Sequence, residues 1–266
     1  MSIKVTILGC GSSGGVPRIG GDWGACDPGN PKNRRRRCSI LVERINAQNE
    51  ATRVLIDTSP DMHAQLTDLG IRWLDGVLYT HEHADHTHGI DDLRALAING
   101  KRRIDTYMND QTRSALEHKF GYCFKTPPGS EYPPILTSHQ MTAGKPVTID
   151  GPGGTVTLLP FEQLHGSIKS LGFRIENLAY SSDLHDLPEK SLSALQGLDV
   201  WIIDALRYRP HPSHFNVEDA LGWVKRMKPR HAVLTNMHVD LDYNALSNEL
   251  PQDIEPAYDG MRFELT

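Results

Sequence analysis

The sequence predicts a fold of the α/β (α+β) class, in which two mixed β-sheets pack face to face and helices lie outside them. Short apolar runs of strand length recur along the whole chain, and helical patterns lie between only some of them. Each half of the chain places several strands before its first long helix. A plain doubly wound sheet would alternate strands and helices more strictly. At 266 residues the chain is long enough to bury a substantial core.

Ten segments are predicted to be strands, because apolar and β-branched residues follow one another there between turn residues. They are Lys4–Leu8, Ser39–Glu43, Arg53–Asp57, Gly76–Tyr79, Arg103–Met108, Thr155–Pro160, Ser170–Glu176, Leu178–Tyr180, Val200–Ala205 and Ala232–Thr235. Helical spacing is found in Asp61–Leu69, Asp91–Asn99, Asp110–Phe120, Glu189–Leu195, Asn216–Met227 and Asp240–Leu250. The Pro- and Gly-rich segment Lys125–Pro134 is predicted to be a mobile loop or flap. Because no linker or repeat divides the chain, residues 1–266 are predicted to form a single domain.

Composition limits the classes of partner and compartment. The formal net charge of −5 provides no general basic field for holding a long nucleic acid, but small anionic substrates stay open. No apolar run is long enough to span a membrane. The four cysteines are scattered without paired spacing, which indicates a reduced, cytoplasmic protein. A homodimer is left open.

The run His81-Glu82-His83-Ala84-Asp85-His86 is the strongest chemical signal in the chain. It lies between an apolar strand-like segment that ends at Thr80 and a helical pattern from Ile90, so its side chains can converge from one tight turn. Imidazole nitrogens and carboxylate oxygens are ligands that zinc and neighbouring first-row metals prefer. The alternative, a polar loop with chance histidines, does not account for this spacing. The run therefore predicts a metal site.

Three later residues are candidates for the remaining ligands of a dinuclear site. His165, Asp183 and His238 each lie a few residues after a predicted strand, where loop-built sites collect their groups. Taken singly, His165 could be a turn residue and Asp183 a helix N-cap. Together with the first loop they favour metal binding.

These ligand positions resemble the signature of the metallo-β-lactamase superfamily, and the resemblance covers nearly the whole chain. The glycine loop Gly9–Pro17, followed by the stretch Arg34–Ser39, is similar to the branch of the phosphoribosyl cyclic phosphodiesterases. That branch is near the transfer-RNA 3′-processing endonucleases and the pyrroloquinoline quinone biosynthesis protein. The resemblance implies a four-layer αββα sandwich with two metal ions at one edge.

The resemblance also implies a role for each ligand position. His81, His83 and His165 would hold the first ion, Asp85, His86 and His238 the second, and Asp183 would bridge both. Two ions about 3.5–4 Å apart would polarise a bridging hydroxide that attacks phosphorus, with Asp85 among the catalytic residues. The ligand set favours zinc, and the oxygen-containing second site keeps manganese open.

Other residues are predicted to act around this centre. His214 precedes a predicted helix, at the place where the phosphodiesterase branch carries a histidine that helps the leaving oxygen depart, and His211 is its nearby competitor. Its alternative role is a capping or surface histidine. Asp57 and Asp204 end strands and could orient ligand imidazoles or simply cap turns.

Substrate contacts are predicted for the glycine loop and for the arginine run 34–37. Backbone amides near Ser12 and Ser13 could approach a phosphate, and Arg35 could line a phosphate pocket. A solvated sheet edge is the alternative for the arginines. Some members of this branch hold a separate structural zinc, but only Cys26 stands at the expected place here. Cys38 lies far beyond it, and Leu241 replaces the late histidine. That zinc site is expected to be missing, with the loop Asp22–Pro31 held by its own packing and turns.

The leading hypothesis is a dimetal phosphodiesterase that acts on a small phosphorylated ribose, nucleotide or cyclic phosphate ester. Three alternatives remain, namely an RNA 3′-end endonuclease, a metal-containing nucleotide-binding or biosynthetic accessory protein, and a carbonyl ester or thioester hydrolase. The ions themselves do not choose between phosphorus and carbon.

Overall fold

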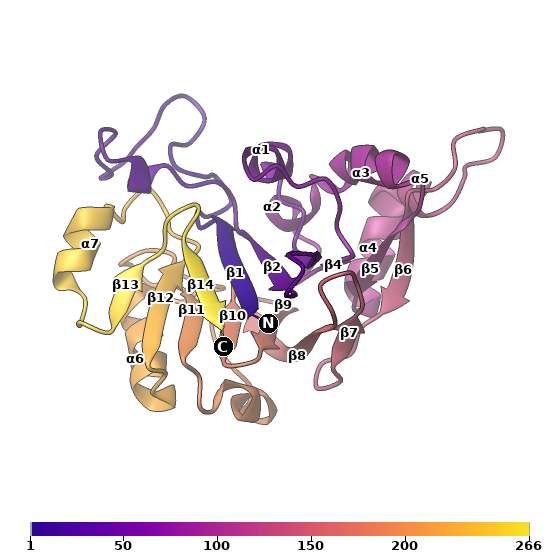
Figure 1. Cartoon of the computed structure of the whole chain (residues 1–266). Helices are drawn as coiled ribbons and strands as arrows, with labels where there is room; N and C mark the ends of the chain where they lie inside the picture. Colours follow the sequence, from indigo (N-terminus) through magenta and orange to yellow (C-terminus); the bar gives the residue numbers. More distant parts are fainter. Residues whose placement is uncertain (1, 266) are drawn as a thin grey trace.

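Two seven-stranded β-sheets face each other, and helices lie on their outer sides (Figure 1). This computed structural model describes residues 2–265. The strands of the first sheet are β1 (Ser2–Gly9), β2 (Ser39–Ile45), β3 (Ala51–Ile56), β4 (Gly76–Leu78), β5 (Ile104–Met108), β6 (Leu136–Gln140) and β14 (Arg262–Leu265). Those of the second are β7 (Val147–Ile149), β8 (Val156–His165), β9 (Ile168–Ile175), β10 (Leu178–Ser181), β11 (Val200–Asp204), β12 (His231–Thr235) and β13 (Ile254–Pro256).

The helices connect these strands along the outer faces. They are α1 (Met62–Asp68), α2 (Ala84–Thr87), α3 (Leu93–Gly100), α4 (Asp110–Lys119), α5 (Gly121–Phe124), α6 (Val217–Met227) and α7 (Tyr243–Glu249). Three 3₁₀ segments add Pro31–Asn33, Ile90–Asp92 and Glu189–Leu195, the last of which was predicted as a helix. No helix among residues 2–265 is both long and apolar enough to cross a bilayer.

Both sheets are mixed, as predicted. The first has the order β14-β1-β2-β3-β4-β5-β6 and the second β13-β12-β11-β10-β9-β8-β7. Pairing is parallel from β3 to β6 and from β10 to β13, and antiparallel elsewhere. All ten predicted strands are present. The prediction missed β6, β7, β13 and β14, which are the edge strands of the two sheets.

The layers follow from the two-residue period of the strands. In β2, Leu41 packs into the apolar cluster under α1, α3 and α4, whereas Ile40 and Val42 pack into the cluster between the sheets. In β3, Leu55 likewise packs into the cluster under the helices, whereas Val54 and Ile56 pack into the cluster between the sheets. Because successive side chains point to opposite faces, one apolar strand can supply both layers of core.

Three polar residues turn the chain sharply where strands end. Asp57 follows β3, Asp183 follows β10 by two residues and Asn236 follows β12, with φ angles of 65°, 58° and 60°. Asp and Asn tolerate this left-handed conformation better than other residues with a Cβ, because their short side chains bond locally. These turns direct polar groups to one edge of the sandwich.

Arg35 does not line a phosphate pocket, and that prediction is wrong. Its side chain is 1% exposed. Nη2 donates to the Leu241 carbonyl (2.7 Å), and Nη1 lies 3.4 Å from the His238 carbonyl and 3.8 Å from Cys26 Sγ. A guanidinium can reach several acceptors at once because its donors form a fixed fork. Here it ties the early loop to the segment that follows β12.

The loop Asp22–Pro31 is therefore held by more than its own packing and turns. Besides Arg35, Cys26 Sγ lies 3.4 Å from the carbonyls of both Val239 and Leu241. Asn33 adds a 2.6 Å hydrogen bond to Asp242. Cys26 and Cys38 belong to neither potential metal-binding group within residues 2–265, and the four cysteines are free and buried.

Asp259 is expected to make the stability of the fold depend on pH. Its buried carboxyl accepts the backbone N–H groups of Cys10 (3.2 Å) and Arg36 (2.8 Å). Burial raises the pKa of Asp259 from 3.8 to about 7. Between these values the folded chain binds more protons than the unfolded chain, so the free energy of unfolding falls as the pH rises.

The Asp259→Asn variant should lose the decrease in the free energy of unfolding that the titration of Asp259 causes. That contribution is a few kcal/mol at most. Denaturant unfolding at several pH values between 4 and 7.5 measures it. The exposed Asp110→Asn is the matched control and should keep the wild-type slope. An unchanged slope in Asp259→Asn would show that this carboxyl titrates normally.

Candidate metal centre

The predicted ligands gather at the edge of the sandwich where β4, β10 and β12 end, beside the hairpin of β8 and β9. A cavity of about 420 Å³ opens there. Its wall includes His83, Asp85, His165, Asp183, His214 and His238. Ser12 and Ser13 of the glycine loop also line it, so these two predicted contact residues lie within reach of a ligand.

The first group consists of His81, His83, His165 and Asp183, whose ligand atoms lie within 4.8 Å of one another. Asp183 Oδ2 is 3.8 Å from His81 Nε2 and 3.7 Å from His165 Nε2. His165 Nε2 is 3.2 Å from His83 Nδ1. A tetrahedral ion with bonds of about 2.1 Å needs ligand atoms roughly 3.4 Å apart, which these separations bracket.

The second group consists of Asp85, His86 and Asp183. His86 Nε2 is 3.5 Å from Asp85 Oδ2 and 3.1 Å from Asp183 Oδ1. The two carboxylate oxygens of Asp183 therefore face different groups. This is the arrangement a carboxylate needs to contact two cations at once.

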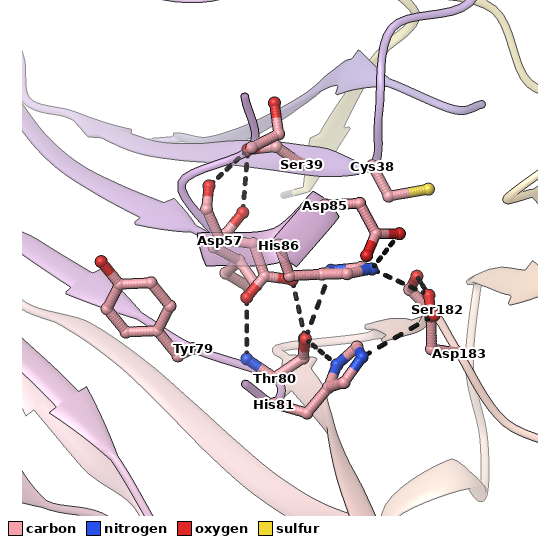
Figure 2. A network of polar contacts seen from close by, with 12 residues as sticks. Cys38, Ser39, Asp57, Tyr79, Thr80, His81, Asp85, His86, Ser182 and Asp183 are labelled. Carbon is pink, nitrogen blue, oxygen red and sulfur yellow. Dashed lines mark hydrogen bonds and ion pairs between the residues drawn. The ribbon is translucent and has the colours of Figure 1, made fainter. Parts of the chain in front are cut away.

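Hydrogen bonds behind the imidazoles set their tautomers. Figure 2 shows His86 between Asp57 and Asp183, with the Thr80 hydroxyl beside both His81 and His86. Asp57 Oδ2 accepts from Thr80 Oγ1 (2.8 Å) and from His86 Nδ1 (2.7 Å). Since the one hydroxyl proton of Thr80 goes to Asp57, Thr80 Oγ1 accepts from His81 Nδ1 (2.9 Å). His165 Nδ1 likewise donates to the Ser213 carbonyl (2.7 Å).

The opposite nitrogens are consequently free to bind a cation. Nε2 of His81 is buried and makes no hydrogen bond, whereas the buried Nε2 of His86 faces carboxylates, at 3.1 Å from Asp183 Oδ1. An unpartnered lone pair in a buried site is costly unless something else satisfies it. These nitrogens converge with the carboxylates of Asp85 and Asp183, so the residues fit a divalent metal ion.

The electrostatics of the site agree with that fit. Burial alone would raise the pKa of Asp183, but the nearby His86, His214 and His81 hold it well below its usual value. Burial alone would lower the pKa of His86, but Asp183, Asp85 and Asp57 raise it well above its usual value. A proton on His86 therefore neutralises part of a carboxylate cluster, and a metal ion bound there would displace it.

His238 lines the cavity but lies outside both groups. Its Nδ1 is 3.2 Å from Asp240 Oδ1, and the side chain is 17% exposed. Metal ligation by His238 thus stays a prediction.

His214 lies next to the first group, with its ring 4.7 Å from that of His165. Nε2 is 3.9 Å from Asp183 Oδ2, and Nδ1 donates to Asp204 Oδ2 at 2.8 Å. Burial alone would lower the pKa of His214, but Asp204 raises it to about 9, so the imidazole is protonated at neutral pH. Asp204 accepts a hydrogen bond from His214 rather than from one of the candidate ligand imidazoles. This corrects the prediction that Asp204 orients a ligand imidazole. Asp57 contacts His86, one of the candidate ligand imidazoles, at 2.7 Å, and its orienting role stays a prediction.

Several residues of the site were not predicted. Asn236 donates to Asp183 Oδ1 (3.1 Å), as does Ser182 (2.6 Å), and Thr80 links Asp57 to His81. Arg18 and Arg207 line the cavity. Thr80, Ser182 and Asn236 share one sequence signal, because each is a polar residue one or two positions after a buried strand at the ligand-bearing edge.

Asp57→Asn is expected to weaken metal binding about 10- to 100-fold, because an imidazole loses its orienting carboxylate. Asparagine tolerates the left-handed backbone of this position, so the fold should survive. Equilibrium dialysis with Zn²⁺ measures the affinity. Asp105→Asn is the matched control, since Asp105 forms a similar 2.8 Å pair with His139 away from the cavity. Equal affinities in the two variants would contradict the assigned role of Asp57.

Comparisons with known proteins agree with this fold. Residues 52–237 match the family described as the Beta-lactamase superfamily domain. A solved structure described as a new diphosphatase from the PhnP family is 33% identical, with a TM-score of 0.88, and the match covers 100% of this chain and 98% of that chain. Zinc-bound PqqB from Methylobacterium extorquens is 17% identical, with a TM-score of 0.74 and coverage of 98% and 100%. Human short-form tRNase Z is 16% identical, with a TM-score of 0.65 and coverage of 98% of each chain.

A curated relative from Porphyromonas gingivalis strain W83, named octanoyltransferase, is 31% identical over 264 residues. The match covers 97% of this chain and 51% of the relative, so the chain spans about half the length of that protein. The superfamily match spans most of the chain, and the PhnP-family structure matches it from end to end. The chain therefore belongs to the β-lactamase superfamily, in the branch that includes the PhnP family.

Proposed function

We propose that this protein is a metal-dependent hydrolase that cleaves phosphodiesters of small molecules, such as a phosphorylated ribose, a nucleotide or a cyclic phosphate ester. One observation carries the proposal: two ligand groups share Asp183, and a protonated His214 lies 3.9 Å from that same carboxylate. A site that hydrolyses phosphodiesters must neutralise the phosphoryl oxygens and protonate the departing oxygen. This edge offers residues for both tasks.

The proposal includes two divalent ions. His81, His83 and His165 would hold one, Asp85 and His86 with His238 the other, and Asp183 would contact both. Nitrogen-rich ligands favour zinc, and the carboxylates of the second group also suit manganese. When bound, such ions supply a nucleophile at neutral pH and positive charge for the phosphoryl oxygens.

The side chains of the protein position the substrate and move the proton. His214 Nε2–H points into the cavity because Nδ1–H is committed to Asp204. As an oxygen from water bonds to phosphorus and the ester P–O bond breaks, His214 gives its proton to the departing alkoxide. The products are a phosphomonoester and an alcohol, and His214 regains a proton from solvent. The pKa of His211 is lowered by burial and by His214, so less of its imidazole carries a proton to donate at neutral pH.

The cavity suits a small substrate. Its volume of about 420 Å³ falls in the range of ordinary ligand pockets. Ser12 and Ser13 bring the glycine loop to its wall, where backbone amides can approach a phosphate. The diphosphatase named among the relatives supports phosphorus as the reacting centre.

Metal loading combined with a substrate panel tests the proposal. We expect about two ions per chain and turnover of bis(p-nitrophenyl) phosphate and of 2′,3′-cyclic nucleotides. Turnover should disappear with a chelator and return with Zn²⁺ or Mn²⁺. Activity should depend only weakly on salt, because a compact ester neutralises few charges, whereas an RNA polymer would show a steep decrease.

The other classes give different results. Hydrolysis of an octanoyl thioester by the metal-loaded protein, with no phosphodiester turnover, would replace phosphorus by carbon as the reacting centre. Two bound ions with neither activity would favour an accessory protein. Either result would overturn the proposed function.

A further inference from the structure

A second cavity adjoins the first, and we infer that it binds a second phosphoryl group, together with the organic group attached to it, of the same substrate. The substrate class is then an organic diphosphate diester. An oxygen from water bonds to the phosphorus at the ligand groups, the P–O–P bond breaks, and the second phosphoryl group leaves with the bridging oxygen, so that two phosphomonoesters are released. This inference rests on the proposed function. To the proposed function, the inference adds a binding site for the second phosphoryl group and its organic group, which lie away from the ligand groups.

The two cavities meet at one wall. The second has a volume of about 500 Å³, and it shares Ser13, Gly14, Arg18 and Asp85 with the first. His165, Asp183 and His214 line only the first. A ligand whose reacting phosphorus lies at the ligand groups can therefore extend past Asp85 into the second cavity.

Arg18 provides the positive charge at this junction. Its closest carboxylate is Asp22, four residues along the chain, at 3.7 Å, and its side chain is 40% exposed. Such an exposed pair is worth little and leaves the guanidinium available to a ligand. A guanidinium binds phosphoryl oxygens through two parallel hydrogen bonds. The shared position of Arg18 places this donor next to the reacting site, where the second phosphoryl group of a diphosphate would lie.

Gly14 explains how Arg18 reaches the junction. A Cβ at Gly14 would lie 3.2 Å from Arg18 Cγ and 3.5 Å from Arg18 Nε, so the side chain passes directly over the glycine. The φ of Gly14 is not positive, so the backbone does not require glycine there. Glycine is needed because a side chain at this position would crowd Arg18. Gly14→Ala would displace Arg18 without removing its charge.

The far part of the second cavity suits an organic group rather than a third phosphate. Ile19, Pro60 and Ala84 line it, and Ile19 is fully exposed. The turn that closes from Arg18 to Asp22 holds Ile19 at its tip, with a 2.9 Å bond from Arg18 N to the Asp22 carbonyl. The other cation on this wall, Arg37, is already paired with Asp61 at 2.9 Å. A sugar or base therefore finds apolar contacts there.

The test compares ADP-ribose, a diphosphate diester, with bis(p-nitrophenyl) phosphate, which has one phosphorus. Arg18→Gln should raise KM for ADP-ribose about 10- to 100-fold, the range of a lost charge-assisted hydrogen bond, and change KM for bis(p-nitrophenyl) phosphate far less. Gly14→Ala should shift KM for ADP-ribose in the same direction by a smaller factor. Arg113→Gln is the control, because this partly exposed arginine of α4 is also paired with a nearby carboxylate, Asp110, and lines neither cavity. ADP-ribose binding to the inactive Asp183→Asn chain, with and without Arg18→Gln, gives a readout that needs no turnover.

The outcomes separate this inference from the proposed function. Equal KM changes on both substrates would place Arg18 at the reacting phosphate and overturn the inference. Turnover of bis(p-nitrophenyl) phosphate without turnover or binding of ADP-ribose would overturn it while the proposed function stands. If neither compound is hydrolysed, the proposed function fails, and the binding measurement alone decides whether Arg18 holds a diphosphate.

Discussion

Replacing Asp183 by asparagine is expected to lower kcat/KM for phosphodiesters by about 10³-fold or more and to reduce the bound metal below two ions per chain. A thousandfold loss corresponds to about 4 kcal/mol of transition-state stabilisation, within the several kcal/mol that metal ions supply. The physical reason is that Asp183 alone has one oxygen toward each ligand group. An amide offers one neutral oxygen in place of that charged pair.

Asparagine is the appropriate replacement because the backbone of Asp183 is left-handed, with φ of 58°. Alanine would add backbone strain and confuse a loss of ligand with a loss of fold. Metal analysis, kcat/KM and thermal unfolding should be measured on the same preparations. A variant that keeps two ions and the wild-type rate would remove Asp183 from the centre.

His214→Ala is expected to affect substrates according to their leaving groups. For alkyl phosphodiesters the loss should reach about 10²- to 10⁴-fold, the usual contribution of a positioned general acid. For bis(p-nitrophenyl) phosphate it should be far smaller, because an activated nitrophenolate departs without a proton. His211→Ala is the matched control, since its imidazole lines the same cavity 5.0 Å from the His214 ring. A uniform loss on both substrates would refute the acid role of His214.

The pH profile gives a second measure of that role. Since the pKa of His214 is raised to about 9, its acid form is present below this pH and is lost above it. Bound cations favour the neutral imidazole, so the alkaline decrease in kcat for alkyl esters is expected at or below pH 9. Asp204→Asn removes the carboxylate that holds the proton and should move this decrease to lower pH. A profile that stays in place in Asp204→Asn would contradict the pairing of Asp204 with His214.

The sequence predicted much of the site because metal ligands carry a local pattern. Three imidazoles and a carboxylate within six positions indicate one centre whatever the rest of the fold does. Arg35 shows the opposite case. In an arginine run the pattern does not say which guanidinium is buried, and only packing against the segment after β12 placed it 2.7 Å from the Leu241 carbonyl. Asp204 was found as a strand-end carboxylate, but its partner lies ten residues away across a turn.

Among the strands, the interior ones were predicted and the edge ones were missed. The ten predicted strands include the buried interior strands, whose apolar runs are read directly from the sequence. The four missed strands form the edges of the sheets. Such strands are short and pair on one side, as in β14, where no residue is buried. Their structure comes from a neighbour rather than from their own composition.

By itself, then, the sequence determined that this chain has two mixed sheets, a turn after β4 rich in candidate metal ligands, and further candidate ligands at strand ends. Only the tertiary structure decided that Asp183 faces both groups, that Thr80 and Asp57 set the tautomers, and that Arg18 stands between two cavities. The physical reason is range. Strand patterns and clustered ligands are written over a few neighbouring residues, whereas orientation, burial and shared cavities arise between segments that meet only when the two sheets close on each other.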